Sequence, residues 1–342
     1  MAVLLIPALR APDTPPWGWL IFVVFIDVGH VYATLYRTYL DPVEFPRRRA
    51  LYTYLPVAAW LVGALLYRVS PLAFWRALAY LAVFHFVRQQ YGFMRAYAHL
   101  EGPKPAWEQR LEAAAIYATM LYPLVYWHAD PARKFWWFVQ GDFLALNRAA
   151  GAWAGGAYAA VLGAFAGRQL WRRKYGLEVH PGKLAVIGTT AAAWYVGIVA
   201  TNSDFAFTVT NIAAHGIPYY ALVWLYGRRA WKDGSWRERW HEATVSGVLA
   251  FAGFLLALAY LEEGVWDSLV WKEHGAIFFG TTASWAPAGG MAAVLIPLLA
   301  LPQATHYLLD AWLWRFDGSN PGLSENLGLL SPKASPIISG TS

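Results

Sequence analysis

Residues Trp17–Tyr36 read WGWLIFVVFIDVGHVYATLY, a predominantly apolar run near the N-terminus of the chain. A helix needs about 20 mostly apolar residues to cross the hydrocarbon core of a bilayer. Asp27 and His30 lie inside this run, three positions apart. A spacing of three places both side chains on one face of a helix. The run therefore predicts a membrane-spanning helix that carries a pair of ionisable side chains.

The composition of the whole chain agrees with this prediction. Of the 342 residues, 58% are hydrophobic and 14% are charged, whereas soluble domains average about 45–50% and about 25%. The 20 Trp and 20 Tyr residues suit aromatic belts at two membrane interfaces. Cysteine is absent, which excludes disulfides, thiolate metal ligands and cysteine nucleophiles. These values are typical of a polytopic membrane protein and exclude an ordinary soluble globule or a disordered chain.

The same length criterion predicts nine spanning helices, and hence an all-α polytopic integral membrane bundle. The predicted spans are Trp17–Tyr36, Leu51–Tyr67, Pro71–Met94, Leu111–Trp127, Ala152–Leu170, Leu184–Ala200, Phe205–Gly227, Ala243–Leu261 and Gly290–Phe316. With the N-terminus outside and the C-terminus inside, most of the 27 lysines and arginines fall in inner loops, as the positive-inside rule requires. We expect residues 1–316 to form one transmembrane domain and residues 317–342 a disordered cytoplasmic tail.

The distribution of charge also predicts the partners of the chain. The net charge of +6 faces the anionic lipid of the cytoplasmic leaflet in this topology. No basic run is interleaved with aromatic residues outside the apolar stretches, which argues against a nucleic-acid partner. We expect a location in the cytoplasmic (inner) membrane of a prokaryote.

Four of the nine histidines lie inside predicted spans, where an ionisable residue marks function by default. They are His30, His85, His215 and His306, on the first, third, seventh and ninth spans. These spans run in the same direction in the predicted topology, so the four rings can meet in one layer. The other five are predicted to be solvated or interfacial, namely His99, His128, His180, His241 and His274.

Each of the four histidines has polar neighbours three or four positions away, on its own helix face. These neighbours are Asp27 for His30, Arg88 and Gln89 for His85, Asn211 for His215, and Gln303 and Asp310 for His306. Membrane helices also use such residues as interhelical hydrogen-bonding groups, but the repetition on four spans favours a site. Imidazole is the commonest metal ligand in proteins, and its second nitrogen is usually held by a carboxylate, a carbonyl or water.

The sequence therefore predicts a membrane-embedded, histidine-ligated metalloenzyme. His30, His85, His215 and His306 are the predicted ligands, and Asp27 and Asp310 are either further ligands or groups that hold the histidines. Arg88, Gln89 and Asn211 are predicted to orient substrate or bound water. Imidazole and carboxylate ligands suit Fe, Zn, Cu or Mn, and iron-dependent oxidation of a lipid or another hydrophobic substrate is the chemistry we expect. The alternatives are a proton-coupled transporter that uses the His–Asp pairs and a haem-binding membrane protein.

Overall fold

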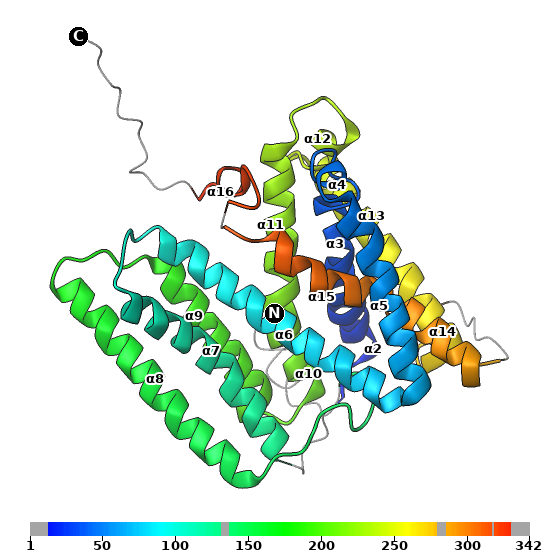
Figure 1. Cartoon of the computed structure of the whole chain (residues 1–342), viewed down its shortest axis with the longest axis horizontal. Helices are drawn as coiled ribbons and strands as arrows, with labels where there is room; N and C mark the ends of the chain where they lie inside the picture. Colours follow the sequence, from blue (N-terminus) through cyan, green and yellow to red (C-terminus); the bar gives the residue numbers. More distant parts are fainter. Residues whose placement is uncertain (1–12, 131–136, 279–284, 317, 330–342) are drawn as a thin grey trace.

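The computed structural model describes residues 13–130, 137–278, 285–316 and 318–329. Over these residues the chain is helical and has no β-strand (Figure 1), which confirms the all-α prediction. The first elements are α2 (Pro16–Gly18), the π-helical segment η1 (Trp19–Val28), α3 (Gly29–Arg37), α4 (Glu44–Arg47), α5 (Arg49–Val69), α6 (Pro71–His99), α7 (Ala106–Ala129) and α8 (Arg148–Lys174).

The second part of the chain contains three more π-helical segments. Its elements are α9 (Pro181–Trp194), η2 (Tyr195–Ala200), α10 (Asp204–Phe207), η3 (Thr208–Ile212), α11 (Ala213–Ala230), α12 (Trp236–Trp240), α13 (Val245–Trp266), η4 (Asp267–Trp271), α14 (Gly289–Leu299), α15 (Leu301–Leu313) and α16 (Leu323–Asn326). Helices therefore occur at all nine of the predicted stretches.

Fewer than nine of these helices are apolar enough to cross a membrane. Among the described residues, five meet the requirement of length and composition, namely Pro16–Arg37, Arg49–Val69, Arg148–Lys174, Pro181–Ala200 and Val245–Trp271. The predicted ninth span is not one straight helix, because α14 and α15 meet at a bend of 46°, and the pair counts as a sixth span if it is taken as one. Helices α6, α7 and α11 are not among these candidates. The nine-span topology stays a prediction.

Two groups of helices lie on either side of α6 (Figure 1). Helices α7, α8 and α9 pack together on one side, and α3, α5, α13 and α14 lie on the other. Helix α15 contacts α3, α5 and α6 and runs across the direction of α5 and α11. Each group has its own apolar core, with Ile116 and Trp194 in one and Tyr36 and Phe251 in another. The junction of these cores is where α3, α6, α11 and α15 approach one another.

Two ion-pair groups lie at the ends of α6, α7, α8 and α9. The first, the ion-pair network, is buried and consists of Glu101, Lys104, Glu112 and Lys183. The second consists of Glu108, Arg168 and Arg172. Lys183 is fully buried, and its Nζ lies 2.8 Å from Glu101 Oε2, 2.7 Å from Glu112 Oε1 and 2.9 Å from Gln169 Oε1. Several of the basic side chains that the sequence assigns to the inner loops are therefore paired with glutamates inside the bundle.

Part of the predicted tail lies within the described residues. Between 318 and 329 it forms α16, and its Ser319 carbonyl oxygen accepts hydrogen bonds from Arg47 and Arg48. Arg229 donates to the Asn326 carbonyl oxygen at 3.3 Å. Residues 317 and 330–342 of the predicted tail lie outside the described residues.

Candidate metal centre

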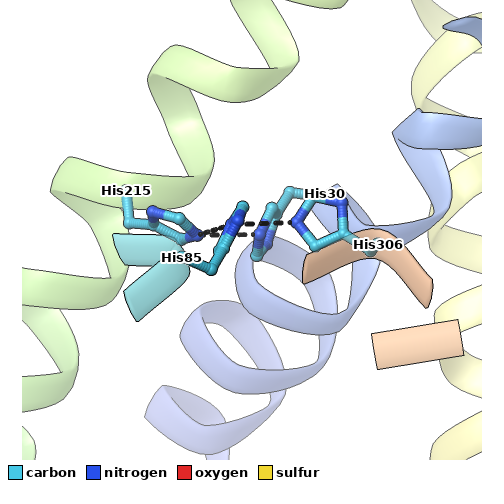
Figure 2. Close-up of side chains that lie close together, drawn as sticks. All are labelled: His30, His85, His215 and His306. Atoms are coloured by element: carbon cyan, nitrogen blue, oxygen red, sulfur yellow. Dashed lines mark hydrogen bonds between the residues drawn. The ribbon is translucent and has the colours of Figure 1, made fainter. Parts of the chain in front are cut away.

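The four histidines that the sequence singles out lie together in the structure (Figure 2). His30 is on α3, His85 on α6, His215 on α11 and His306 on α15. Their Nε2 atoms face one another, at 3.0 Å between His215 and His30, and at 3.1 Å both between His85 and His215 and between His306 and His85. No side chain of the four is more than 2% exposed. Side chains separated by up to 276 positions in the sequence therefore converge at one buried point.

The four rings lie at the corners of a near-square. The sides, measured between ring centroids, are 4.6 Å (His30–His215), 4.8 Å (His215–His85), 4.5 Å (His85–His306) and 4.9 Å (His306–His30). The diagonal between His30 and His85 is 6.4 Å. In a square the diagonal exceeds the side by a factor of about 1.4, whereas in a tetrahedron all separations are equal. The long diagonal between His30 and His85 therefore departs from a regular tetrahedron and resembles that of a square.

The Nδ1 atoms are on the outer side of the rings, and three of the four have polar partners there. His30 Nδ1 lies 3.2 Å from the Ile26 carbonyl oxygen. His306 Nδ1 lies 2.6 Å from Thr34 Oγ1, and His85 Nδ1 lies 3.5 Å from Asp310 Oδ2. A metal-ligating histidine is held in this way through its second nitrogen, which fixes the tautomer and the ring orientation.

His215 is held by packing on its ring instead. Its Nδ1 is buried and has no hydrogen-bond partner among the described residues. The ring stacks on Phe86, with 3.6 Å between centroids and 12° between planes. Gln89 Nε2 donates to the His215 backbone carbonyl oxygen at 2.9 Å. The position of this imidazole is thus set by α6, the helix that also carries His85.

Local distortions of the helices bring the histidines to the centre. The π-helical segment η1 ends two residues before His30, and η3 ends three residues before His215. Such segments shift the face that the following turn presents, and they are frequent at functional sites. The bend between α14 and α15 precedes His306. Three of the four histidines therefore follow an irregularity in their own helix.

Glycines allow the helices of His30 and His215 to approach closely. A Cβ atom at Gly216 would lie 2.7 Å from the Ile26 carbonyl oxygen, the same oxygen that faces His30 Nδ1. A Cβ atom at Gly29 would collide with the Tyr220 hydroxyl group. A larger residue at Gly216 would meet rigid backbone, and one at Gly29 would displace the Tyr220 side chain; each position is next to a histidine of the centre.

The two predicted carboxylates lie behind the histidines. Asp310 Oδ2 faces His85, and its Oδ1 accepts hydrogen bonds from Tyr219 at 2.8 Å and from Trp314 at 3.3 Å. Asp27 Oδ1 lies 3.7 Å from His30 Nδ1, and the side chain of Asp27 is 31% exposed. Both carboxylates contact the outer nitrogens of the rings, and the group of converging ligand atoms contains only histidines.

Of the predicted orienting residues, Gln89 alone contacts a histidine of the centre. Asn211 is buried and donates from Nδ2 to the carbonyl oxygens of Ala193 and Phe207, so it links α10–α11 to α9. The structure does not bring Arg88 to the centre. Its side chain is exposed, and it donates to the Tyr117 hydroxyl group at 2.6 Å. Gln303 donates to Glu262 Oε1 at 2.5 Å.

Sequence reasoning missed two polar residues next to the centre, Thr34 and Tyr219. Thr34 Oγ1 lies 2.9 Å from the Tyr219 hydroxyl oxygen, and both residues are buried. A signal for them exists in the sequence. Thr34, Gln89, Tyr219 and Asp310 each stand four positions after one of the four histidines.

Among the other histidines, His241 departs from the prediction. It is fully buried between α12 and α13, with Tyr36, Trp231 and Phe251 around its ring. Burial lowers the pKa of His241 to about 4, because the charged imidazolium loses its hydration. This histidine belongs to the packing of the bundle and is remote from the centre.

No protein-family profile, curated protein or solved structure matches the chain. The fold provides a buried group of four histidines that can hold a metal ion and several helices apolar enough to span a membrane. These features are compatible with a membrane metalloprotein.

Proposed function

We propose that the chain is a membrane-embedded metalloenzyme that binds one iron ion through His30, His85, His215 and His306 and oxidises a hydrophobic substrate. The convergence of the four Nε2 atoms carries this proposal. A neutral imidazole has one N–H group. His30 Nδ1 faces a carbonyl oxygen, which can only accept, so its hydrogen is on Nδ1 and its Nε2 presents a bare lone pair to the centre. A lone pair of this kind can coordinate a cation at the centre.

The near-square arrangement argues against zinc, because structural and catalytic zinc sites are mostly tetrahedral. Imidazole ligands suit iron and copper as well as zinc, and we propose iron for the redox chemistry that it would supply. Iron bound in this way supplies redox chemistry in a site from which water is largely excluded.

Charge balance supports a divalent ion. Asp310 contacts the outer nitrogens of two histidines, at 3.5 Å to His85 and 3.9 Å to His306, and Asp27 contacts that of His30. These two carboxylates compensate a charge of two at the centre of an apolar bundle, where an uncompensated charge is costly. They hold the ligands in the proposed site and do not bind the ion themselves.

The surroundings support a hydrophobic substrate. The helices of the centre pack among apolar spans, and dioxygen and lipids both partition into a bilayer. Asp27 is 31% exposed while His30, one turn further along the helix, is 1% exposed. A partly exposed side chain therefore lies beside the outer nitrogen of His30, one helical turn away. Membrane lipid or another hydrophobic small molecule is the substrate class that we propose.

The positions of the rings disfavour a haem. Two axial histidines of a haem lie on opposite faces of the macrocycle, which must fit between them. The Nε2 atoms of the four histidines are separated by 3.0–3.1 Å along three sides, so a porphyrin does not fit between these rings.

Elemental analysis and an absorption spectrum of the detergent-purified protein test the proposal. We expect one equivalent of iron, no Soret band, and loss of the iron in His215→Ala and His306→Ala while both variants stay folded. His99→Ala is the matched control, because His99 is on α6 with His85 but is exposed, and it should keep the iron. Full metal content in both variants contradicts the ligand set. If no first-row metal binds even after reconstitution, the metalloenzyme is wrong and a proton-coupled transporter becomes the better hypothesis.

A further inference from the structure

A second layer of polar side chains lies behind the four histidines. Thr34, Tyr219 and Asp310 stand one helical turn after His30, His215 and His306 respectively, and they bond to one another although they come from α3, α11 and α15. Their contacts form a chain from the carboxylate to the ring, with 2.8 Å between Asp310 Oδ1 and the Tyr219 hydroxyl, 2.9 Å to Thr34 Oγ1 and 2.6 Å to His306 Nδ1. All of these atoms are buried or nearly so.

The direction of every hydrogen bond in this chain follows by elimination. Trp314 Nε1 also lies 3.3 Å from Asp310 Oδ1, and an indole N–H can only donate, so this oxygen is an acceptor. Tyr219 therefore donates its hydroxyl hydrogen to Asp310. The Tyr219 oxygen then accepts from the Thr34 hydroxyl, which leaves Thr34 Oγ1 to accept the hydrogen of His306 Nδ1. His306 is thus held with its hydrogen outside and the lone pair of Nε2 at the centre.

We infer that Asp310 acts through Tyr219 and Thr34 as a positioning group that fixes the tautomer of His306 and aims its Nε2 at the metal ion. This inference rests on the proposed metal centre. The other oxygen of the same carboxylate, Asp310 Oδ2, lies 3.5 Å from His85 Nδ1. Asp310 therefore orients two adjacent ligands, His306 and His85. Without the hydrogen bonds from Asp310 through Tyr219 and Thr34, His306 is free to carry its hydrogen on Nε2 and donate it to His85 Nε2, 3.1 Å away. In that tautomer neither the ring nor its neighbour is ready to bind an ion.

Loss of such a supporting contact typically lowers metal affinity by about 10–100-fold. Thr34→Val keeps the shape of the side chain and removes both hydrogen bonds. Tyr219→Phe keeps the ring, which packs in the core with Tyr36 and Val223, and removes the hydroxyl group. We expect both variants to lose affinity for Fe(II), and for Co(II) as a spectroscopic probe, by about 10–100-fold.

Two further variants separate positioning from folding. Thr34→Ser keeps the hydroxyl group and should restore affinity to within about twofold of the wild type, given the normal spread for a retained contact. Tyr220→Phe is the matched control. Tyr220 follows Tyr219 directly, but it donates to the Phe25 carbonyl oxygen and takes no part in the hydrogen bonds between Asp310 and His306. Competition with a chelator of known affinity measures the metal affinity of all four variants. Equal affinities of Thr34→Val, Tyr219→Phe and the wild type overturn the inference while leaving the metal centre intact.

A measurement on the metal-free protein tests the same inference independently of metal binding. In protein with ¹⁵N-labelled histidine, the signals that disappear in His306→Ala identify this ring, and their chemical shifts report which nitrogen carries the hydrogen. We expect the Nδ1–H tautomer in the wild type and in Thr34→Ser, and a gain of the Nε2–H tautomer in Thr34→Val. An Nε2–H tautomer in the wild type overturns the inference. If the wild type binds no metal but shows the expected tautomers, the proposed function fails and the positioning chain stands.

Discussion

The four-histidine centre and the ion-pair network at the ends of α6 to α9 are both buried polar groups inside an apolar bundle, but they are built in opposite ways. In the network each contact pairs a donor with an acceptor, as between Lys183 Nζ and the carboxylates of Glu101 and Glu112. In the centre, ring nitrogens of the same kind face one another at 3.0–3.1 Å. The outer nitrogens of the centre, by contrast, are mostly satisfied.

This difference separates a structural group from a binding group. Buried charges persist when they are paired and hydrogen-bonded, as they are in the network. In the proposed metal centre, a bound ion completes the inward nitrogens. Removal of a side chain should therefore unfold the protein in one region and release an ion in the other, and four experiments exploit this contrast.

The largest effect on stability is expected from Lys183→Met. Removing one partner of a buried pair costs about 3–5 kcal/mol, because the remaining charges stay buried. Thermal unfolding in detergent should show a much lower midpoint, while the metal content of the protein that is still folded stays the same. Lys232→Met is the control, since its ion pair with Glu238 is exposed and such pairs are worth about 0–1 kcal/mol. A loss of metal from folded Lys183→Met would show that the two regions are coupled.

The next effect is the stabilisation that the metal ion provides. A ligand that binds only the folded state at 100 times its dissociation constant stabilises it by about 2.7 kcal/mol. Adding Fe(II) to the metal-free wild type and to metal-free Lys183→Met should raise both unfolding midpoints by similar amounts. His85→Ala should show no rise. An equal rise in His85→Ala would place the binding site elsewhere.

A smaller effect is expected at the close contact between α11 and η1. Gly216→Ala places a methyl group 2.7 Å from the Ile26 carbonyl oxygen, and such overpacking costs about 1–3 kcal/mol. Because this oxygen also holds His30, metal affinity should fall as well. Gly188→Ala on α9 is the control, because open space surrounds that position, and alanine there is expected to be neutral or stabilising by up to about 1 kcal/mol. Unchanged stability and affinity in Gly216→Ala would contradict the packing described.

The smallest effect concerns the pH dependence of the network. Burial opposes ionisation of Glu101, but hydrogen bonds from Lys183 and from the His180 N–H group outweigh it and hold the pKa of Glu101 below its ordinary value. A lowered pKa in the folded state adds stability at pH values above that of the unfolded chain, about 4.3, and this stability is lost as the pH falls through the folded value. The difference in unfolding midpoint between the wild type and Glu101→Gln should therefore be constant above about pH 5 and shrink below about pH 4. If the difference in unfolding midpoint grew as the pH fell, the pKa of Glu101 would be raised in the folded state and the prediction would be wrong.

The sequence predicts the histidine group well because histidine is conspicuous in an apolar stretch. Thr34 and Tyr219 are not conspicuous, since threonine packs readily in membrane helices and tyrosine occurs 20 times in the chain. Their role depends on which helices are neighbours, and a single sequence does not show this. The spacing of four after each histidine is present in the sequence, but it acquires a meaning only once the contact between α3, α11 and α15 is known.

Arg88 and Gln89 show the limit of reasoning from helix spacing. At about 100° per residue, positions three and four after His85 lie on opposite sides of its direction. Gln89 falls on the side of α11 and bonds to His215, whereas Arg88 falls on the side of α7 and bonds to Tyr117. The assignment of lysines and arginines to inner loops has a similar limit, because the sequence does not show that Lys183 and Arg172 are paired with glutamates inside the bundle.

The distribution of the ligands along the chain has a consequence for biosynthesis. His30 is on the first long helix and His306 on α15, so the last ligand leaves the ribosome long after the first. A nascent chain that has inserted everything up to α14 holds three of the four imidazoles and lacks both His306 and Asp310. The four-histidine group is therefore completed only at a late step of biosynthesis, and the proposed metal ion meets its full set of ligands only after α15 has joined the bundle.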